Sequence, residues 1–205
     1  MKKIILVVLL LLINPLYAAT SSADDASLLK EKLAKFQQIN ADFSQVVRNP
    51  EGEIINESQG KLTISRPGKF RWEVTNPDEE LIISDGVTMW MYSPFIEQVT
   101  LINLSDAIVG TPFVLLSGGD NQRWQDYQIS KDNNRFTIKN KVDKEQKNSF
   151  IFEFNEAGNI AKFVVIEEQG QRSEFTLTQQ PVEQKITADY FNFEIPAGVE
   201  IDDQR

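Results

Sequence analysis

Residues 69–93 read KFRWEVTNPDEELIISDGVTMWMYS and contain strand patterns separated by turn residues. Asp85-Gly86 between two apolar runs is typical of a two-residue hairpin loop. A loop at these two residues would place Ile82 opposite Met89 on the neighbouring strand. Strand patterns this close together predict antiparallel neighbours joined by tight turns.

Both faces of this hairpin carry large apolar side chains, whereas a sheet with one solvated face would alternate cleanly between apolar and polar residues. One face presents Ile82, Val87, Met89 and Met91, and the other presents Leu81, Ile83, Trp90 and Tyr92. The sheet must therefore be covered on both sides at this point. We expect an N-terminal helix on one side and residues 103–119 on the other.

Short strand patterns continue along most of the chain and are separated by turn residues such as Arg66-Pro67-Gly68 and Asn76-Pro77. About eleven strands are expected, over 41–48, 53–65, 69–76, 79–84, 87–93, 96–101, 124–131, 134–140, 148–155, 160–168 and 172–180. This succession predicts a mainly β (α+β) fold built as an antiparallel meander. At 205 residues a single domain is expected.

Two segments depart from the strand pattern. Residues 27–39 place apolar side chains at helical spacing between lysines and a glutamate, which predicts an amphipathic helix. In 103–119, Ser105 is expected to cap a short helix through Val109, and Thr111-Pro112 to begin a second. Helices this short need an apolar surface to lie on. They can be a permanent plug or a lid over an apolar cavity.

The composition excludes several kinds of chemistry. The chain has no cysteine and no histidine, so disulfides, thiol nucleophiles, histidine-based triads and thiolate or imidazole metal sites are excluded. Neither a cofactor nor a metal is expected. The net charge is −9 at pH 7, which argues against nucleic acid as a partner.

Residues 1–18 have the layout of a secretory signal peptide. Lys2 and Lys3 precede ten apolar residues, Ile4 to Ile13, and Ala18 offers a small residue for cleavage. Without this segment, 19 basic and 30 acidic residues remain, a net charge of −11. We expect residues 19–205 to be one exported, soluble domain.

Matches to catalytic motifs are weak. Ser58 and Lys61 have the Ser-x-x-Lys spacing of serine acyl-enzymes, but they fall in a predicted strand instead of at a helix start. Adjacent carboxylates such as Glu79-Glu80 and Glu167-Glu168 point to opposite faces of a strand and cannot flank one bond. They are expected to be solvated edges. We therefore do not expect an enzyme, and a carboxylate-based hydrolase is the enzymatic alternative.

Eight short motifs in consistent order resemble one family, the periplasmic outer-membrane lipoprotein carrier proteins of the LolA family. They are Phe43-Ser44-Gln45, Arg66-Pro67, Phe70-Arg71-Trp72, Ser84-Asp85-Gly86, Trp90-Met91-Tyr92, Glu97-Gln98-Val99, Thr111-Pro112-Phe113 and Asp202-Asp203-Gln204-Arg205. The resemblance implies an unclosed half-barrel with helices forming a lid over an apolar cavity.

The same resemblance implies a function in the periplasm. A family member is a chaperone that accepts triacylated lipoproteins from an ATP-driven, ABC-type exporter of the inner membrane and delivers them to an outer-membrane receptor. A monomer is expected. The receptor shares the fold but needs a lipidated N-terminal cysteine, which this chain lacks. A lipid- or lipoprotein-sensing regulatory half-barrel remains the alternative.

The resemblance also assigns roles to residues. Arg66 is implied to bond the lid backbone and hold it shut, while a turn residue bonding loop carbonyls is the alternative. Lys69 and Arg71 flank Phe70 and are expected to add positive charge near the cavity mouth. The residues expected to line the cavity or lid are Phe70, Trp72, Ile82, Met89, Met91, Phe113, Leu116 and Phe163.

Overall fold

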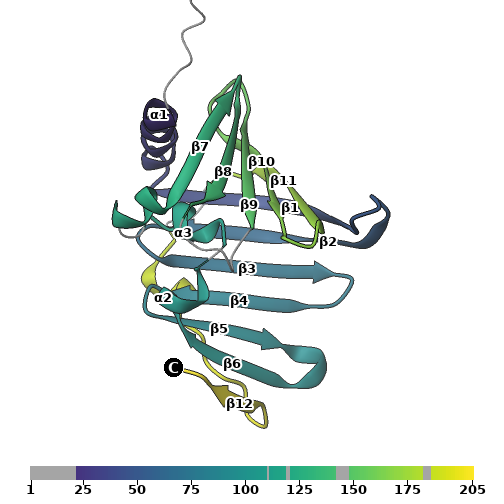
Figure 1. The fold of residues 1–205 in the computed structure, drawn as a ribbon. Helices are drawn as coiled ribbons and strands as arrows, with labels where there is room; N and C mark the ends of the chain where they lie inside the picture. The colour runs from purple at the N-terminus through teal and green to yellow at the C-terminus, as the bar shows by residue number, and fades with distance from the viewer. Residues whose placement is uncertain (1–21, 110, 119–120, 142–147, 182–185) are drawn as a thin grey trace, which may run out of the picture.

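A computed structural model describes residues 22–205 apart from 110, 119–120, 142–147 and 182–185 (Figure 1). Its strands form one unclosed sheet in the order β12-β6-β5-β4-β3-β2-β1-β11-β10-β9-β8-β7. The sheet curves, and the two short helices α2 (Leu104–Ala107) and α3 (Phe113–Leu116) lie inside the curve (Figure 1). The predicted mainly β half-barrel is confirmed. The predicted signal peptide lies outside the described residues.

The strand boundaries lie close to those predicted from the sequence. The strands are β1 (Gln38–Arg48), β2 (Ile54–Ser65), β3 (Lys69–Asn76), β4 (Glu80–Asp85), β5 (Thr88–Ser93), β6 (Gln98–Asn103), β7 (Tyr127–Asp132), β8 (Arg135–Asn140), β9 (Ser149–Phe154), β10 (Ile160–Ile166), β11 (Arg172–Gln179) and β12 (Glu200–Asp203). Short 3-10 helices are η1 (Pro94–Ile96), η2 (Asn121–Asp126) and η3 (Ala188–Phe191).

The chain order does not follow one continuous meander. Strands β1 to β6 form one meander and β7 to β11 another, joined where β1 pairs antiparallel with β11. Strands β6 and β7 therefore lie far apart in the sheet although they are neighbours among the predicted strands. Residues 104–126 connect them and contain the two short helices.

The count of about eleven strands missed β12, which pairs parallel to β6. The expectation of a purely antiparallel sheet was wrong at this edge. The C-terminal segment first crosses the outer face of the sheet, where η3 contacts β3 and β4, and then reaches the β6 edge. Strand β12 has four residues with little burial, so the hydrophobic pattern gave it no distinct mark.

The β4–β5 hairpin has a different register from the one expected. Ser84 lies opposite Met89 and Ile82 opposite Met91, so the loop is Gly86-Val87. The Asp85 carboxylate accepts the backbone N–H groups of Val87 at 2.8 Å and of Thr88 at 2.9 Å. Gly86 takes a φ of 103°, which glycine adopts without steric cost. Asp85 therefore stabilises the turn through its side chain, although it precedes the two loop residues.

The N-terminal helix α1 spans Ser22–Ala34 instead of 27–39. Ile39 belongs to β1, where it lies opposite Ile64 of β2, so sheet pairing replaced the last helical turn. Leu29 and Leu33, one turn apart, are buried in the core. The helix runs beside edge strand β7, and the Asp25 carboxylate accepts the backbone N–H of Lys131 at 3.0 Å.

The covers of the two sheet faces also differ from the expectation. The outer face of the β4–β5 hairpin is covered by the C-terminal segment, where the ring of Phe193 lies 5.4 Å from that of Tyr92 and 6.5 Å from that of Trp90. Residues 104–109 and 111–116 lie on the inner face, and α1 packs at the β7 edge (Figure 1). The N-terminal helix therefore covers neither face of this hairpin.

Replacing Gly60 with alanine is expected to destabilise the fold by about 1–3 kcal/mol, the usual cost of overpacking. A Cβ at Gly60 would lie 1.9 Å from the Glu73 carbonyl oxygen and 2.8 Å from the Phe43 ring. Urea unfolding checks this, with Gly158→Ala as control because no atom lies within 4 Å of its Cβ position. Since Gly158 has a φ of 83°, the control itself carries some strain. A loss well below about 1 kcal/mol for Gly60→Ala would contradict the prediction.

The stabilising effect of Glu174 is expected to disappear in acid. Hydrogen bonds from Lys162 at 2.7 Å and Arg172 at 2.6 Å lower the pKa of this carboxyl from 4.5 to about 2. A lowered pKa stabilises the fold above 4.5, and the gain is lost as the pH falls towards 2. Wild type and Glu174→Gln should therefore differ in urea midpoint at pH 7, and the difference should shrink as the pH falls from 4.5 towards about 2. A difference that is constant with pH would contradict this.

Candidate functional site

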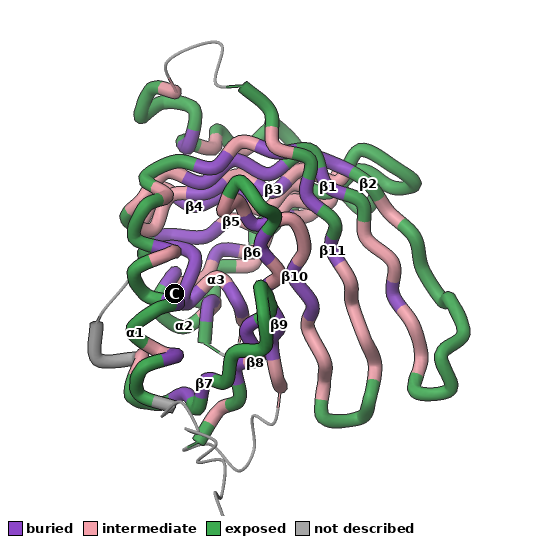
Figure 2. The backbone as a smooth tube through the Cα atoms, turned by 90° about the horizontal axis from the view of Figure 1, so that it is seen from above, coloured by how far each residue is buried: buried purple, intermediate pink, exposed green. Residues whose placement is uncertain are grey.

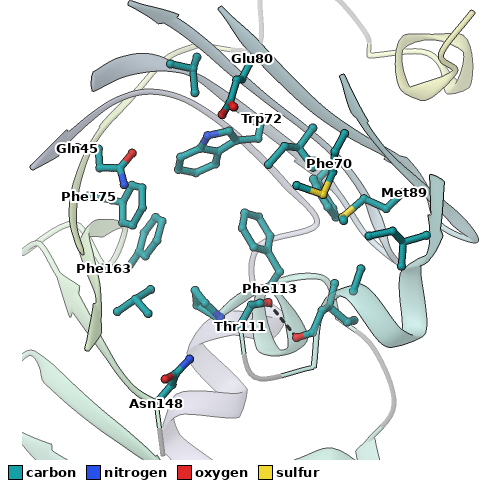
Figure 3. A pocket seen from close by; sticks show the side chains of 18 of the residues that line it. Gln45, Phe70, Trp72, Glu80, Met89, Thr111, Phe113, Asn148, Phe163 and Phe175 are labelled. Atoms are coloured by element: carbon teal, nitrogen blue, oxygen red, sulfur yellow. Dashed lines mark hydrogen bonds between the residues drawn. The ribbon is translucent and has the colours of Figure 1, made fainter. Parts of the chain in front are cut away.

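A cavity of about 560 Å³ lies inside the curve of the sheet, between its concave face and the two short helices (Figure 3). The lining is mainly apolar and comes from both meanders. It consists of Gln45, Phe70, Trp72, Val74, Glu80, Ile82, Met89, Met91, Ile102, Ala107, Ile108, Thr111, Pro112, Phe113, Asn148, Phe163, Val165, Glu167 and Phe175. This volume is within the range of about 300–1,000 Å³ that is usual for ligand pockets.

A cluster of aromatic rings forms the wall where the two meanders meet. Phe163 of β10 stacks on Phe175 of β11 with ring centroids 4.3 Å apart, and Trp72 of β3 meets Phe175 edge-on at 5.2 Å. Phe43 of β1 stacks on Trp72 at 4.0 Å and meets Phe175 edge-on at 6.3 Å. These contacts bridge the β1–β11 junction, so the wall is held in place by its own packing.

The two short helices are α2 (Leu104–Ala107) and α3 (Phe113–Leu116). Phe113 projects from α3 into the cavity and stacks on Phe70 at 4.8 Å (Figure 3). The predicted caps were wrong. Ser105 lies within α2, and Thr111 donates its hydroxyl to the carbonyl of Ile108 at 2.9 Å, so it braces the linker between the helices.

Arg66 joins the sheet to the end of α3. Its Nε donates to the carbonyl of Leu116 at 2.8 Å and its Nη2 to that of Leu115 at 3.2 Å. The backbone N–H of Gly68 also donates to the Ser117 carbonyl at 2.9 Å. Burial lowers the pKa of the Arg66 guanidinium, which still carries its charge at neutral pH. Three free carbonyls at a helix end thus find donors.

Close packing around Arg66 depends on a glycine. A Cβ at Gly118 would lie 2.9 Å from Cδ of Arg66, and Gly118 has a φ of 73°. The chain therefore leaves α3 in a left-handed conformation that places the arginine directly beneath it. Gly110 and Gly119, also predicted to give backbone freedom at these helix ends, lie outside the described residues.

The structure places seven of the eight residues predicted to line the cavity or lid around the cavity. They are Phe70, Trp72, Ile82, Met89, Met91, Phe113 and Phe163. Leu116 does not line it and is 1% exposed within the core. Because α3 has a single turn, Phe113 reaches the cavity while the side chains after it are buried. Leu116 contributes its carbonyl, which accepts a hydrogen bond from Arg66.

The expected positive charge of Arg71 lies on the outer face, away from the cavity. Its guanidinium contacts the Glu73 carboxylate at 3.2 Å and lies 5.4 Å from the ring centre of Tyr190 in η3. Successive side chains of a strand point to opposite faces, so Arg71 points away from the cavity that Phe70 lines. Lys69 follows the same alternation. Neither residue is among those that line the cavity.

The sequence reasoning missed several residues of the site. Phe175 is central to the aromatic wall and lies in a predicted strand, where its alternation with Leu177 was the available signal. Glu80 and Glu167 were expected to be solvated edges; Glu80 is exposed and Glu167 is half-buried, and both also line the cavity. Whether these residues line the cavity depends on which strand ends meet across the sheet, and a local sequence pattern does not predict that.

Two kinds of feature are absent from the described residues. No group of three or more His, Cys, Asp or Glu side chains there is arranged to hold a metal ion. No helix in the same part of the chain is long and apolar enough to cross a membrane.

Comparisons with known proteins identify relatives over the whole length. The family model for the outer membrane lipoprotein carrier protein LolA matches residues 34–194. An outer-membrane lipoprotein carrier protein of Psychromonas ingrahamii is 62% identical over 205 residues, covering 100% of both chains. Another from Aeromonas salmonicida is 41% identical over 198 residues, covering 95% of this chain and 98% of its own.

One solved structure supports the fold alone. The structure of an uncharacterized conserved protein from Thermus thermophilus aligns with a TM-score of 0.52. The match covers 90% of this chain and 100% of that one at 11% sequence identity.

Proposed function

Because the chain belongs to the LolA family of outer membrane lipoprotein carrier proteins, we propose that it carries lipoproteins through the periplasm with their acyl chains in the cavity. The observation that carries this proposal is the apolar cavity of about 560 Å³ beneath two short helices, the second of which receives a hydrogen bond from Arg66 at the Leu116 carbonyl. Such a site can exclude water from a ligand without any reacting group. The proposed role is therefore transport and not catalysis.

The cost of exposing acyl chains explains why a carrier is needed. Three chains of about 15 methylenes each, at about 0.8 kcal/mol per methylene, would lose roughly 36 kcal/mol on entering water. Spontaneous release from a membrane is therefore negligible. We propose that an ATP-driven ABC-type exporter of the inner membrane supplies the cargo directly, and that an outer-membrane receptor accepts it.

The size of the cavity supports a lid that moves during loading. If a methylene displaces about as much volume as one water, about 30 Å³, the observed cavity of about 560 Å³ holds little more than one such chain. Three chains need the space that Phe113 now occupies between Phe70 and Trp72. In the proposed cycle the described conformation is the closed one, and loading requires α3 to leave Arg66.

The test uses spheroplasts that synthesise a labelled lipoprotein and secrete nothing of their own to bind it. Purified residues 19–205 are added, and the soluble fraction is analysed for a stoichiometric complex. We expect release that depends on both the added protein and ATP. A form of the same cargo without its acylated cysteine should not form the complex.

One outcome of this experiment would contradict the carrier proposal. If no labelled lipoprotein becomes soluble while a known carrier releases it from the same spheroplasts, the carrier proposal is overturned. The regulatory half-barrel would then be the function to test, by asking whether a lipid changes binding of a second protein.

A further inference from the structure

The concave face of the sheet changes from apolar to polar along its strands. On β1, Phe43 is followed on the same face by Gln45, and on β4, Ile82 is preceded by Glu80. Gln45 lies opposite Ser58 of β2, whose hydroxyl donates to Oε1 of Gln45 at 2.8 Å. The apolar side chains lie towards the lid, and the polar ones lie at the far ends of the strands.

These polar ends form a second space of about 530 Å³, which we call the polar compartment. It is lined by Gln45, Val47, Ile55, Asn56, Ser58, Val74, Pro77, Asp78, Glu80 and Gln171. Three of these residues, Gln45, Val74 and Glu80, also line the apolar cavity, so the two spaces adjoin. Figure 2 shows the far ends of β1, β2 and β11 extending beyond the buried core as exposed and half-buried chain.

The chemistry of the polar compartment differs from that of the cavity. Gln45, Asn56 and Gln171 carry primary amides, which donate and accept hydrogen bonds as a peptide backbone does. Asp78 and Glu80 add carboxylates, and Glu167 lines the adjoining cavity. No lysine or arginine is among the lining residues that the structure describes for either space. The compartment therefore suits a peptide that is neutral or basic.

We propose that the polar compartment holds the peptide segment that follows the acylated residue of the cargo, and that it disfavours acidic segments. This inference rests on the proposed function, because it takes the acyl chains to occupy the adjoining cavity. The cargo is then an oriented amphiphile: its chains lie under α2 and α3, and its peptide leaves past Gln45 and Glu80. The compartment would select among lipoproteins by the charge of their first residues.

The test measures binding of synthetic triacylated lipopeptides that differ only in the segment after the acylated cysteine. The segments are Ser-Lys-Lys-Ser, Ser-Ser-Ser-Ser and Ser-Asp-Asp-Ser. Binding to residues 19–205 is followed by displacement of a fluorescent fatty acid. We expect the basic lipopeptide to bind about fivefold tighter than the acidic one at low salt, with the ratio falling towards one in high salt.

Two variants and a control separate the compartment from the rest of the surface. Asp78 is exposed, so Asp78→Lys should fold and should abolish or reverse the preference for the basic lipopeptide. Asn56→Trp should obstruct the compartment and weaken the neutral lipopeptide about threefold or more, while fatty acid binding is unchanged. Glu156→Lys makes the same charge change at an exposed turn outside both spaces and should leave the preference intact.

The outcomes distinguish the two proposals. If the fatty acid does not bind at all, the carrier proposal fails, and this inference fails with it. If the fatty acid and all three lipopeptides bind, but with equal affinity and no effect of Asp78→Lys or Asn56→Trp, the role of the polar compartment is overturned while the carrier stands.

Discussion

Replacing Phe70 with glutamate is expected to weaken acyl-chain binding at least about a hundredfold, because a charge at this position must be buried without a partner. Phe70 is 2% exposed, lines the cavity and stacks on Phe113 of the lid at 4.8 Å. A carboxylate there would lose its hydration when acyl chains pack against it. The change would also remove the ring contact between Phe70 and Phe113 of α3. Displacement of a fluorescent fatty acid measures the loss.

A matched control exists for this change. Phe95, in η1, is 87% exposed, so Phe95→Glu introduces the same group where water can solvate it and should leave binding intact. Because Phe70→Glu can also unfold the protein, circular dichroism must accompany the titration, and Phe70→Leu provides a variant without charge. A folded Phe70→Glu protein that binds like wild type would show that acyl chains do not enter this cavity.

Replacing Arg66 with leucine is expected to free the lid. The change removes two hydrogen bonds from a charged donor to the carbonyls of Leu115 and Leu116, a loss of roughly 2–4 kcal/mol. Because about 1.4 kcal/mol corresponds to a factor of ten in an equilibrium constant, this loss should raise the open population of α3 about 30- to 1,000-fold. Hydrogen exchange at the Ser117 amide, which donates to the Phe113 carbonyl, reports this directly.

Two further variants test whether the effect is specific to the hydrogen bonds between Arg66 and α3. Arg71→Leu removes an arginine from the outer face of β3, where it contacts Glu73, and should leave exchange in α3 unchanged. Arg66→Lys keeps the charge but cannot donate in the same fork, so it should lie between wild type and Arg66→Leu. Unchanged exchange in Arg66→Leu would mean that Phe113 and the buried side chains of α3 hold the lid without the arginine.

Local sequence patterns predicted most of the secondary structure. The eleven strands from β1 to β11 follow from alternating side chains between turn residues, and the two short helices follow from an apolar run flanked by glycines. These features depend on residues a few positions apart, which is the range over which periodicity and turn chemistry act. The family resemblance singled out Arg66, which donates to the carbonyls of Leu115 and Leu116, and seven of the eight residues predicted beside it line the cavity.

Errors arose where one local interaction competed with another. Asp85-Gly86 favours a loop at those two residues, but the Asp85 side chain bonded to Val87 and Thr88 and moved the loop by one position. At the N-terminus, the helical spacing of apolar residues continues through Ile39, but Ile39 pairs with Ile64 of β2 and belongs to β1. A pattern cannot show which of two compatible structures gains the stronger partners.

The sequence by itself determined strands β1 to β11, most of the turns between them and two short apolar helices, because each is encoded by neighbouring residues. Only the tertiary structure decided that β1 pairs with β11, that β12 joins β6 in parallel, and that the C-terminal segment covers the outer face. It also decided that Glu80 and Glu167 lie beside the cavity. These arrangements join residues more than 80 positions apart, where the pairing depends on the packing of whole strands and not on any local pattern.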